Sequence, residues 1–170
     1  MEMNRDLNLR KWYLIVAGMS LAYLIIEIVK NMVGVLYNIG YVTQLILISL
    51  VVVFSVALIV KARRSNKSRL VPILFLIGAL SGVVSTFTFV ASFIYMMVVI
   101  FSNPSISFDE MYGQSEQLIS AFNEQQINML NMVLSLGDIT ALVSWVLLVS
   151  ATFLGFYNAY KLGQLAAGAE

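Results

Sequence analysis

The chain has 170 residues, of which 60% are hydrophobic and 11% charged, and its formal net charge is +1. A soluble domain carries about a quarter charged residues, so this composition excludes an ordinary soluble globule and predicts an integral membrane protein. The chain has no cysteine and no histidine, which excludes disulfides, thiolate metal sites and histidine-based acid–base chemistry within it.

Four apolar runs follow one another along the chain, each reaching the length of about 20 residues that crosses a hydrocarbon core of about 30 Å. They predict transmembrane helices at about residues 12–30, 41–60, 71–101 and 129–160. A segment in lipid must satisfy its own backbone hydrogen bonds, so we expect an all-α, four-helix membrane bundle that forms a single membrane domain over residues 1–170. The sequence leaves open whether residues 31–40 form a loop or extend the two helices that they join.

The first run carries Glu27 and Lys30 near its outer end, and Asp138 stands at the outer boundary of the fourth span. We expect these three residues to form a small polar cluster near the outer surface. An ion pair with a structural role is the simpler interpretation, since Glu27 and Lys30 lie one helical turn apart. A proton or cation site is the alternative, because an ionisable residue within a membrane is a functional candidate.

The segment KARRSNKSR, residues 61–69, joins the second and third spans and carries five basic residues and no acid. Short, positively charged loops stay in the cytoplasm, so this loop predicts that both termini are cytoplasmic too, in a multi-pass protein of the cell membrane. This topology places nine of the ten basic residues inside and Lys30 outside. Binding of nucleic acid or anionic lipid is the alternative explanation of the cluster. Because topology alone accounts for the cluster, we expect no nucleic-acid partner.

The third run contains GALSG, residues 78–82, in which Gly78 and Gly82 form a GxxxG motif that Ser85 extends. Small residues let helices approach closely in lipid, where packing replaces the hydrophobic drive. We expect this stripe to pack within the chain, against Gly18 and Ala22 of the first helix. Homodimerisation through the stripe is the alternative.

The third and fourth runs are longer than a bilayer needs. Their 31 and 32 residues correspond to about 46–48 Å of helix, so they tilt or project beyond the membrane. Pro72 suits the first turn of a helix, where its missing N–H has no acceptor to lose. It therefore fixes the inner end of the third helix and leaves the excess length on the outside.

Residues 102–128 form the outer loop, in which Ser107 and Glu110 have the spacing of a capping box. We expect an amphipathic helix to begin at Phe108, with its apolar side chains on one face. This outer docking face consists of Phe108, Met111, Tyr112, Leu118, Ile119 and Phe122. It packs either on the protein's own protruding helices or on another subunit or the membrane interface. The sequence leaves this choice open, as it does whether the helix continues into the fourth span as one rod.

In outline, four helices with a short first outer loop and a longer second one resemble the layout of tetraspanins. The chain has no cysteine, so the Cys-Cys-Gly signature of that family's large loop is missing. The resemblance covers topology alone, which unrelated four-helix proteins share, and we assign no family on it.

The sequence contains no Walker motif, dinucleotide fingerprint, metalloprotease motif or nucleophile elbow. We therefore expect no enzyme activity, no cofactor and no metal site. The preferred hypothesis is a non-enzymatic accessory or scaffold subunit, whose partners are the lipid bilayer and other membrane subunits or further copies of itself. The alternative is a small oligomeric ion or proton channel or transporter, with Glu27, Lys30 and Asp138 at its outer mouth.

Overall fold

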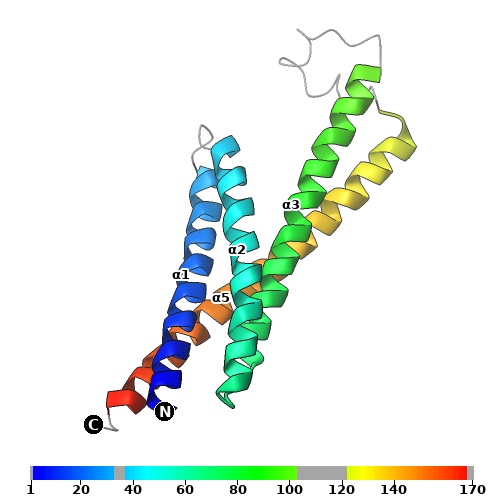
Figure 1. The fold of residues 1–170 in the computed structure, drawn as a ribbon. Helices are drawn as coiled ribbons and strands as arrows, with labels where there is room; N and C mark the ends of the chain where they lie inside the picture. The colour runs from blue at the N-terminus through cyan, green and yellow to red at the C-terminus, as the bar shows by residue number, and fades with distance from the viewer. Residues whose placement is uncertain (1, 33–36, 103–121, 168–170) are drawn as a thin grey trace. The chain divides into compact units, whose positions relative to one another are not determined.

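The computed structural model of the chain describes residues 2–32, 37–102 and 122–167. These residues form four helices, which are shown in Figure 1 and are α1 (Glu2–Met32), α2 (Tyr37–Arg64), α3 (Leu70–Ser102) and α5 (Glu124–Ala167). No strand occurs among the residues that are described. The prediction of an all-helical chain is therefore confirmed.

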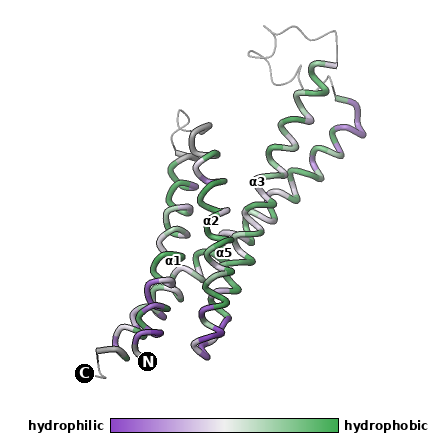
Figure 2. The backbone as a smooth tube through the Cα atoms, viewed as in Figure 1, coloured by the Kyte–Doolittle hydropathy of each residue, from purple (hydrophilic) through white to green (hydrophobic). Residues whose placement is uncertain are grey.

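All four helices are long and apolar enough to cross a membrane. The candidate spans are Asn4–Val29, Val42–Arg64, Leu70–Ser102 and Glu124–Leu165. Figure 2 shows long hydrophobic stretches in each helix, with hydrophilic residues at helix ends. This pattern is typical of a membrane helical bundle, because a helix is the form in which an apolar segment satisfies its backbone in lipid.

The helices extend beyond the apolar runs that predict them. Helix α1 begins at Glu2, well before Trp12, and continues to Met32, while α2 begins at Tyr37. Most of residues 31–40 are thus helical, and residues 33–36 lie outside the described part. Hydropathy marks only the part of a helix that is suited to lipid. Residues 2–12 contain neither Pro nor Gly, so they can continue the helix beyond the apolar run.

The end of α2 is fixed by a left-handed residue, Asn66, whose φ is 51°. The amide of Lys67 donates to the carbonyl of Ala62 at 3.0 Å, and that of Asn66 donates to the carbonyl of Arg63 at 3.2 Å. These two bonds are the pattern of a Schellman motif, in which Asn is the common substitute for Gly. The chain then enters α3, in whose first turn Pro72 lies as its missing donor predicts.

The described chain divides into two compact units, residues 1–83 with 141–170 and residues 84–140. The first, here called the four-helix unit, contains α1, α2, the first turns of α3 and the C-terminal half of α5. Its core is formed by apolar side chains from all four helices, including Tyr13, Val16, Ile48, Phe75 and Leu148. Helices α1 and α2 lie side by side and run antiparallel (Figure 1).

The second unit, here called the two-helix unit, contains the later turns of α3 and the first turns of α5. The helices approach closely at Gly137, where an added Cβ would lie 2.7 Å from the Thr88 hydroxyl oxygen. Helix α5 starts with a reciprocal cap, because the amide of Gln126 donates to Asn123 Oδ1 at 2.8 Å and the amide of Asn123 donates to Gln126 Oε1 at 2.9 Å. This is the geometry of a capping box. With this cap, α5 begins at Glu124. It therefore does not continue back toward residue 108 as one rod.

Candidate functional site

A row of polar side chains follows the face of α1 that packs inside the four-helix unit. Ser20, Tyr23 and Glu27 are spaced by three and four residues, the spacing that keeps side chains on one helical face. Ser20 is fully buried and Tyr23 is 6% exposed, while Glu27 is partly buried. An apolar helix therefore presents its polar groups to the other helices rather than to its surroundings.

The Glu27 carboxylate is held by a side chain of α2. Gln44 Nε2 donates a hydrogen bond to Glu27 Oε2, and Gln44 is itself 2% exposed. A hydrogen bond to a charged group is stronger than one between neutral groups. A buried amide without a partner is also costly. The pair therefore explains why a glutamine and a glutamate occupy otherwise apolar helices.

Tyr23 extends the polar site from α1 to α5. Its phenol interacts electrostatically with Glu27 and is directed at the Ser144 hydroxyl. The Ser144 oxygen is buried and has no hydrogen-bond partner of ordinary geometry among the described residues, so the Tyr23–Ser144 contact is looser than the Glu27–Gln44 bond. The four residues Glu27, Gln44, Tyr23 and Ser144 are here called the polar core site.

Gly82 of α3 closes the polar core site. A Cβ added to it would lie 2.8 Å from Ser144 Oγ, 3.2 Å from the Tyr23 hydroxyl oxygen and 3.2 Å from Ile48 Cδ1. Because these atoms belong to three other helices, the missing side chain is what lets α3 approach them. A carboxylate, an amide, a phenol and a hydroxyl are thereby brought together among apolar helices.

Further polar pairs connect α1 with α5 between the polar core site and the N-terminal end of α1. The Thr152 hydroxyl donates to Ser20 Oγ at 2.9 Å, and the Tyr13 hydroxyl interacts with the Asn158 side chain. In this antiparallel pairing, higher numbers on α1 correspond to lower numbers on α5. The buried Ser55 of α2, whose oxygen has no partner among the described residues, is about 16 Å along its helix from Gln44. Polar groups thus recur along the interior of the four-helix unit.

The contact between Trp12 and Lys61 gives the site its position along the helices. Lys61 Nζ lies 4.7 Å from the centre of the Trp12 ring, so these residues are level with each other. Glu27 is fifteen residues from Trp12 and Gln44 seventeen from Lys61, which correspond to about 22 and 26 Å of helix. The two values agree within one helical turn. The polar core site therefore lies far from the basic end of this unit.

The structure places one of the three residues predicted for the outer polar cluster in the polar core site. Glu27 lies in the site described above, whereas the structure describes only the backbone at Lys30. Asp138 is exposed and belongs to the two-helix unit, so its proximity to Glu27 and Lys30 stays a prediction. Gln44, Tyr23 and Ser144 are not among the residues that the sequence predicts for this site. The sequence offers two signals for this site. Tyr23 and Glu27 have the spacing of one helical face, and Gln44 is an amide within the apolar second run.

The small-residue stripe of α3 faces α5 as well as α1 and α2. A Cβ on Gly78 would lie 3.0 Å from Leu148 Cγ and 3.1 Å from Leu147 Cβ. At Gly18 nothing lies within 4 Å of the Cβ position, and Ala22 is partly buried. Ser85 belongs to the two-helix unit, where its carbonyl accepts a hydrogen bond from the Thr88 hydroxyl at 2.8 Å.

Most of the outer docking face falls outside the described residues. These are Phe108, Met111, Tyr112, Leu118 and Ile119. Phe122 is described and is partly buried, directly before the cap of α5. The amphipathic helix over this segment therefore stays a prediction.

Among the described residues, no group of three Asp or Glu side chains is arranged to hold a metal ion. The polar core site offers one carboxylate and several donors around it. Such a set can stabilise a charge or bind a small cation. Comparisons with protein-family models, with curated proteins and with solved structures found no match to the chain.

Proposed function

We propose that this protein is a non-enzymatic accessory or scaffold subunit that packs beside other membrane proteins in an assembly. The observation that carries the proposal is the exposed apolar surface of the two-helix unit. Among its described residues only Ser92 and Val99 are buried, while large apolar side chains are exposed along both of its helices. These include Phe87, Phe93, Ile94, Val98, Phe101, Met129, Met132, Leu136 and Ile139.

Helix length supports a protein partner for this surface in addition to lipid. Helix α3 has 33 residues and α5 has 44, or about 50 and 66 Å, against a hydrocarbon core of about 30 Å. A helix of this length either tilts strongly or projects into water. Apolar side chains on a projecting segment need a cover, which a transmembrane neighbour with a projecting helix of its own would supply.

The proposal includes an orientation. Basic residues gather where α1 begins, where α2 passes into α3 and where α5 ends, and all of these belong to the four-helix unit. The positive-inside rule places this end in the cytoplasm, with both termini and the segment from Lys61 to Arg69. The connection between α3 and α5 then lies on the outer side of a multi-pass protein of the cell membrane.

Photo-crosslinking in the native membrane tests the accessory function. A photoreactive amino acid at Ile94, which is 56% exposed on the two-helix unit, is compared with one at Val53, which is 63% exposed on α2. We expect defined protein adducts at Ile94 and lipid adducts at Val53, with the adduct identified by mass spectrometry. Lipid adducts alone at both positions would contradict the proposal, and an adduct with a second copy of the chain would assign the surface to self-association.

The polar core site favours a second candidate, a small oligomeric ion or proton channel or transporter. Its support is the Glu27–Gln44 pair among apolar helices, with the Thr152–Ser20 pair and the Tyr13–Asn158 contact following toward the basic end. Ionisable residues are rare inside membrane helices, and those that occur there commonly mark ion pathways. Glu27 would stand near the outer mouth of such a pathway.

Flux through reconstituted vesicles tests this second candidate. Glu27→Gln removes the charge while keeping the shape, and Glu124→Gln at the exposed start of α5 is the matched control. If the chain conducts protons or cations, we expect Glu27→Gln to lower the flux at least tenfold and Glu124→Gln to leave it within twofold. Equal flux in all three proteins would exclude Glu27 from a pathway.

A further inference from the structure

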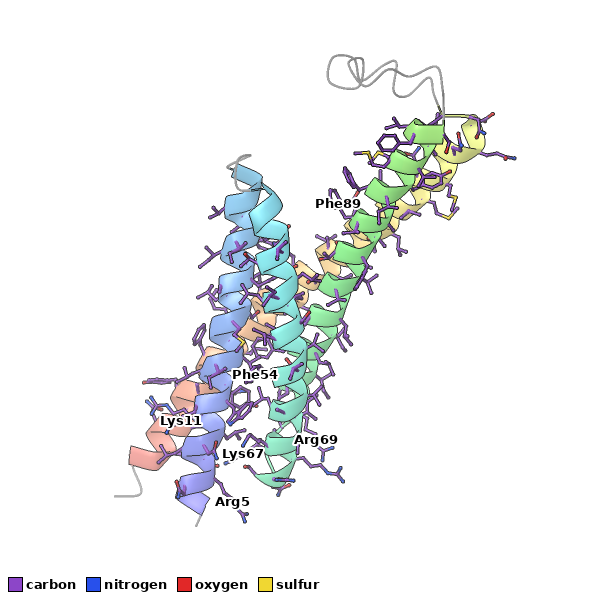
Figure 3. All side chains as sticks on the ribbon, turned by 45° about the horizontal axis from the view of Figure 1, so that its top comes forward. Arg5, Lys11, Phe54, Lys67, Arg69 and Phe89 are labelled. Carbon is purple, nitrogen blue, oxygen red and sulfur yellow. The ribbon has the colours of Figure 1, made fainter. Side chains whose placement is uncertain are left out.

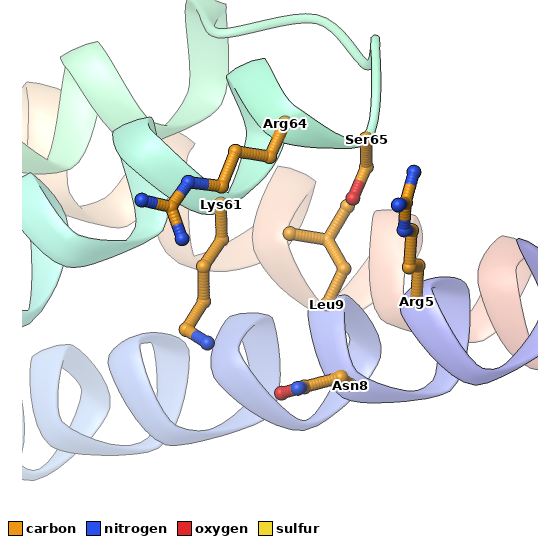
Figure 4. A pocket seen from close by; sticks show the side chains of 6 residues that line it. All are labelled: Arg5, Asn8, Leu9, Lys61, Arg64 and Ser65. Carbon is orange, nitrogen blue, oxygen red and sulfur yellow. The ribbon is translucent and has the colours of Figure 1, made fainter.

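A pocket of about 430 Å³ opens at the basic end of the four-helix unit, between the first turns of α1 and the last turns of α2. Its described lining consists of Arg5, Asn8, Leu9, Lys61, Arg64 and Ser65. Figure 4 shows Lys61 reaching from α2 across toward α1, with Arg5 rising from α1. The lining therefore combines three cations with amide and hydroxyl donors, and no acid is among its described residues.

The charges of this pocket are not neutralised by the described part of the chain. Asp6, which directly follows Arg5 in α1, pairs with Lys67 at 3.4 Å, and neither Asp6 nor Lys67 lines the pocket. Arg5, Lys61 and Arg64 make no ion pair with a described residue. Three cations of like charge around one cavity repel each other, and a bound anion would remove this repulsion.

An aromatic surface adjoins the cations. Lys61 Nζ lies over the Trp12 ring at 4.7 Å, and this ring packs against Phe54 with centroids 5.5 Å apart. Tryptophan favours the depth of lipid headgroups, where its ring is partly apolar and partly wet. The pocket thus offers cations where a phosphate would bind, and the aromatic rings beside Lys61 lie outside its lining, where the first carbons of a lipid would follow. Figure 3 shows Arg5, Lys11, Lys67 and Arg69 on the same end of the molecule as Phe54.

We infer that this pocket binds a phosphate group, and that the phosphate belongs to an anionic phospholipid of the inner leaflet. Basic pockets between transmembrane helices on the cytoplasmic side are typical binding sites for anionic headgroups. Arginine supplies paired N–H donors to phosphate oxygens, while lysine supplies a compact charge. The choice of the inner leaflet rests on the orientation proposed above. The binding of phosphate rests on neither the partner surface nor the polar core site, so the titration below tests it separately.

Trp12 provides the readout. The purified full chain in a non-ionic detergent, with Trp145→Phe so that Trp12 alone fluoresces, is titrated with three probes: dihexanoyl phosphatidylglycerol, dihexanoyl phosphatidylcholine and inorganic phosphate. We expect saturable binding of phosphatidylglycerol at least fivefold tighter than that of the zwitterionic lipid. Equally tight binding of inorganic phosphate would also support a phosphate site and would assign it to the free ion. Absence of saturable binding of every probe overturns the inference.

Charge variants separate the pocket from a general basic surface. Each cation near a membrane surface contributes about fivefold in binding of an anionic lipid, so Arg64→Gln and Arg5→Gln are each expected to weaken phosphatidylglycerol binding about fivefold. The control is Arg63→Gln, which neighbours Arg64 on α2 but does not line the pocket. Equal weakening by Arg63→Gln would overturn the inference in favour of diffuse attraction. Circular dichroism of each variant verifies that the helices are intact.

Discussion

The absence of a Cβ atom at Gly82 determines how closely the helices of the four-helix unit approach one another there. Its absent side chain leaves room for Ser144 Oγ, the Tyr23 hydroxyl and Ile48 Cδ1, each of which would lie within 3.2 Å of a Cβ. Gly18 provides the opposite case, since nothing lies within 4 Å of its Cβ position. Substitution at Gly82 therefore tests the close packing of the helices, whereas substitution at Gly18 tests only the low helix propensity of glycine.

We expect Gly82→Ala to destabilise the protein and Gly18→Ala to leave its stability unchanged or higher. The first change forces three neighbours apart, which costs about 1–3 kcal/mol, while the second replaces a poor helix former at an open position. Thermal unfolding in detergent, followed by circular dichroism, measures both. The double variant Gly82→Ala with Ser144→Ala should recover part of the loss, because it removes the atom closest to the new Cβ. Equal stability of Gly82→Ala and Gly18→Ala would show that the close approach does not form.

The Glu27–Gln44 hydrogen bond is also testable residue by residue. A double-mutant cycle with Glu27→Leu and Gln44→Leu isolates the interaction of the two side chains. Hydrogen bonds between membrane helices contribute about 0.6 kcal/mol on average and about 1.7 kcal/mol at most. We expect a coupling of about 1 kcal/mol in unfolding experiments in mixed micelles. A coupling near zero would mean that the two side chains do not meet, whatever each single variant does.

At the scale of the element, Asn66 determines where α2 ends and how Arg64 and Ser65 reach the phosphate pocket. A β-branched residue in the left-handed conformation costs about 1–2 kcal/mol, whereas glycine adopts it readily. We therefore expect Asn66→Val to lower the unfolding free energy by about that amount and Asn66→Gly to preserve it. Thermal unfolding measures the difference. Equal loss in both variants would point to the asparagine side chain rather than to its backbone.

Hydropathy predicts the spans because lipid leaves an apolar segment no alternative to the helix, so all four runs lie within helices. It does not predict helix ends, since the polar residues before Trp12 remain helical and the capping box at Asn123 interrupts any continuation of α5 toward residue 108. The candidate site was predictable only in part. Glu27 stands out as a charge in an apolar run. Its partner Gln44, and Ser144 beside Tyr23, depend on how each helix is rotated, which side-chain packing decides. The GALSG stripe likewise indicates a close approach without naming α5 as a neighbour.

For the molecule as a whole, charge is the feature that relates the fold to a membrane. All ten basic residues belong to the four-helix unit, and nine of them lie at the helix ends around Arg5, Lys61 and Lys161. The polar core site lies about 22–26 Å from the Trp12–Lys61 contact. A hydrocarbon core of about 30 Å that begins at Trp12 would contain Glu27 in its outer third. The orientation thus decides whether the carboxylate communicates with the outside of the cell.

Because the chain has no cysteine, single cysteines report this orientation without a background. We expect Ser68→Cys in the α2–α3 connection to react with a membrane-impermeant maleimide only after the cells are permeabilised, because the positive-inside rule predicts a cytoplasmic position for a basic connection. Gln125→Cys at the exposed start of α5 should react in intact cells. Lys161→Cys near the end of α5 provides a second inner position and should behave like Ser68→Cys. The reverse pattern would place the phosphate pocket in the outer leaflet and Glu27 near the cytoplasm, and labelling of all three positions in intact cells would contradict a membrane-spanning bundle.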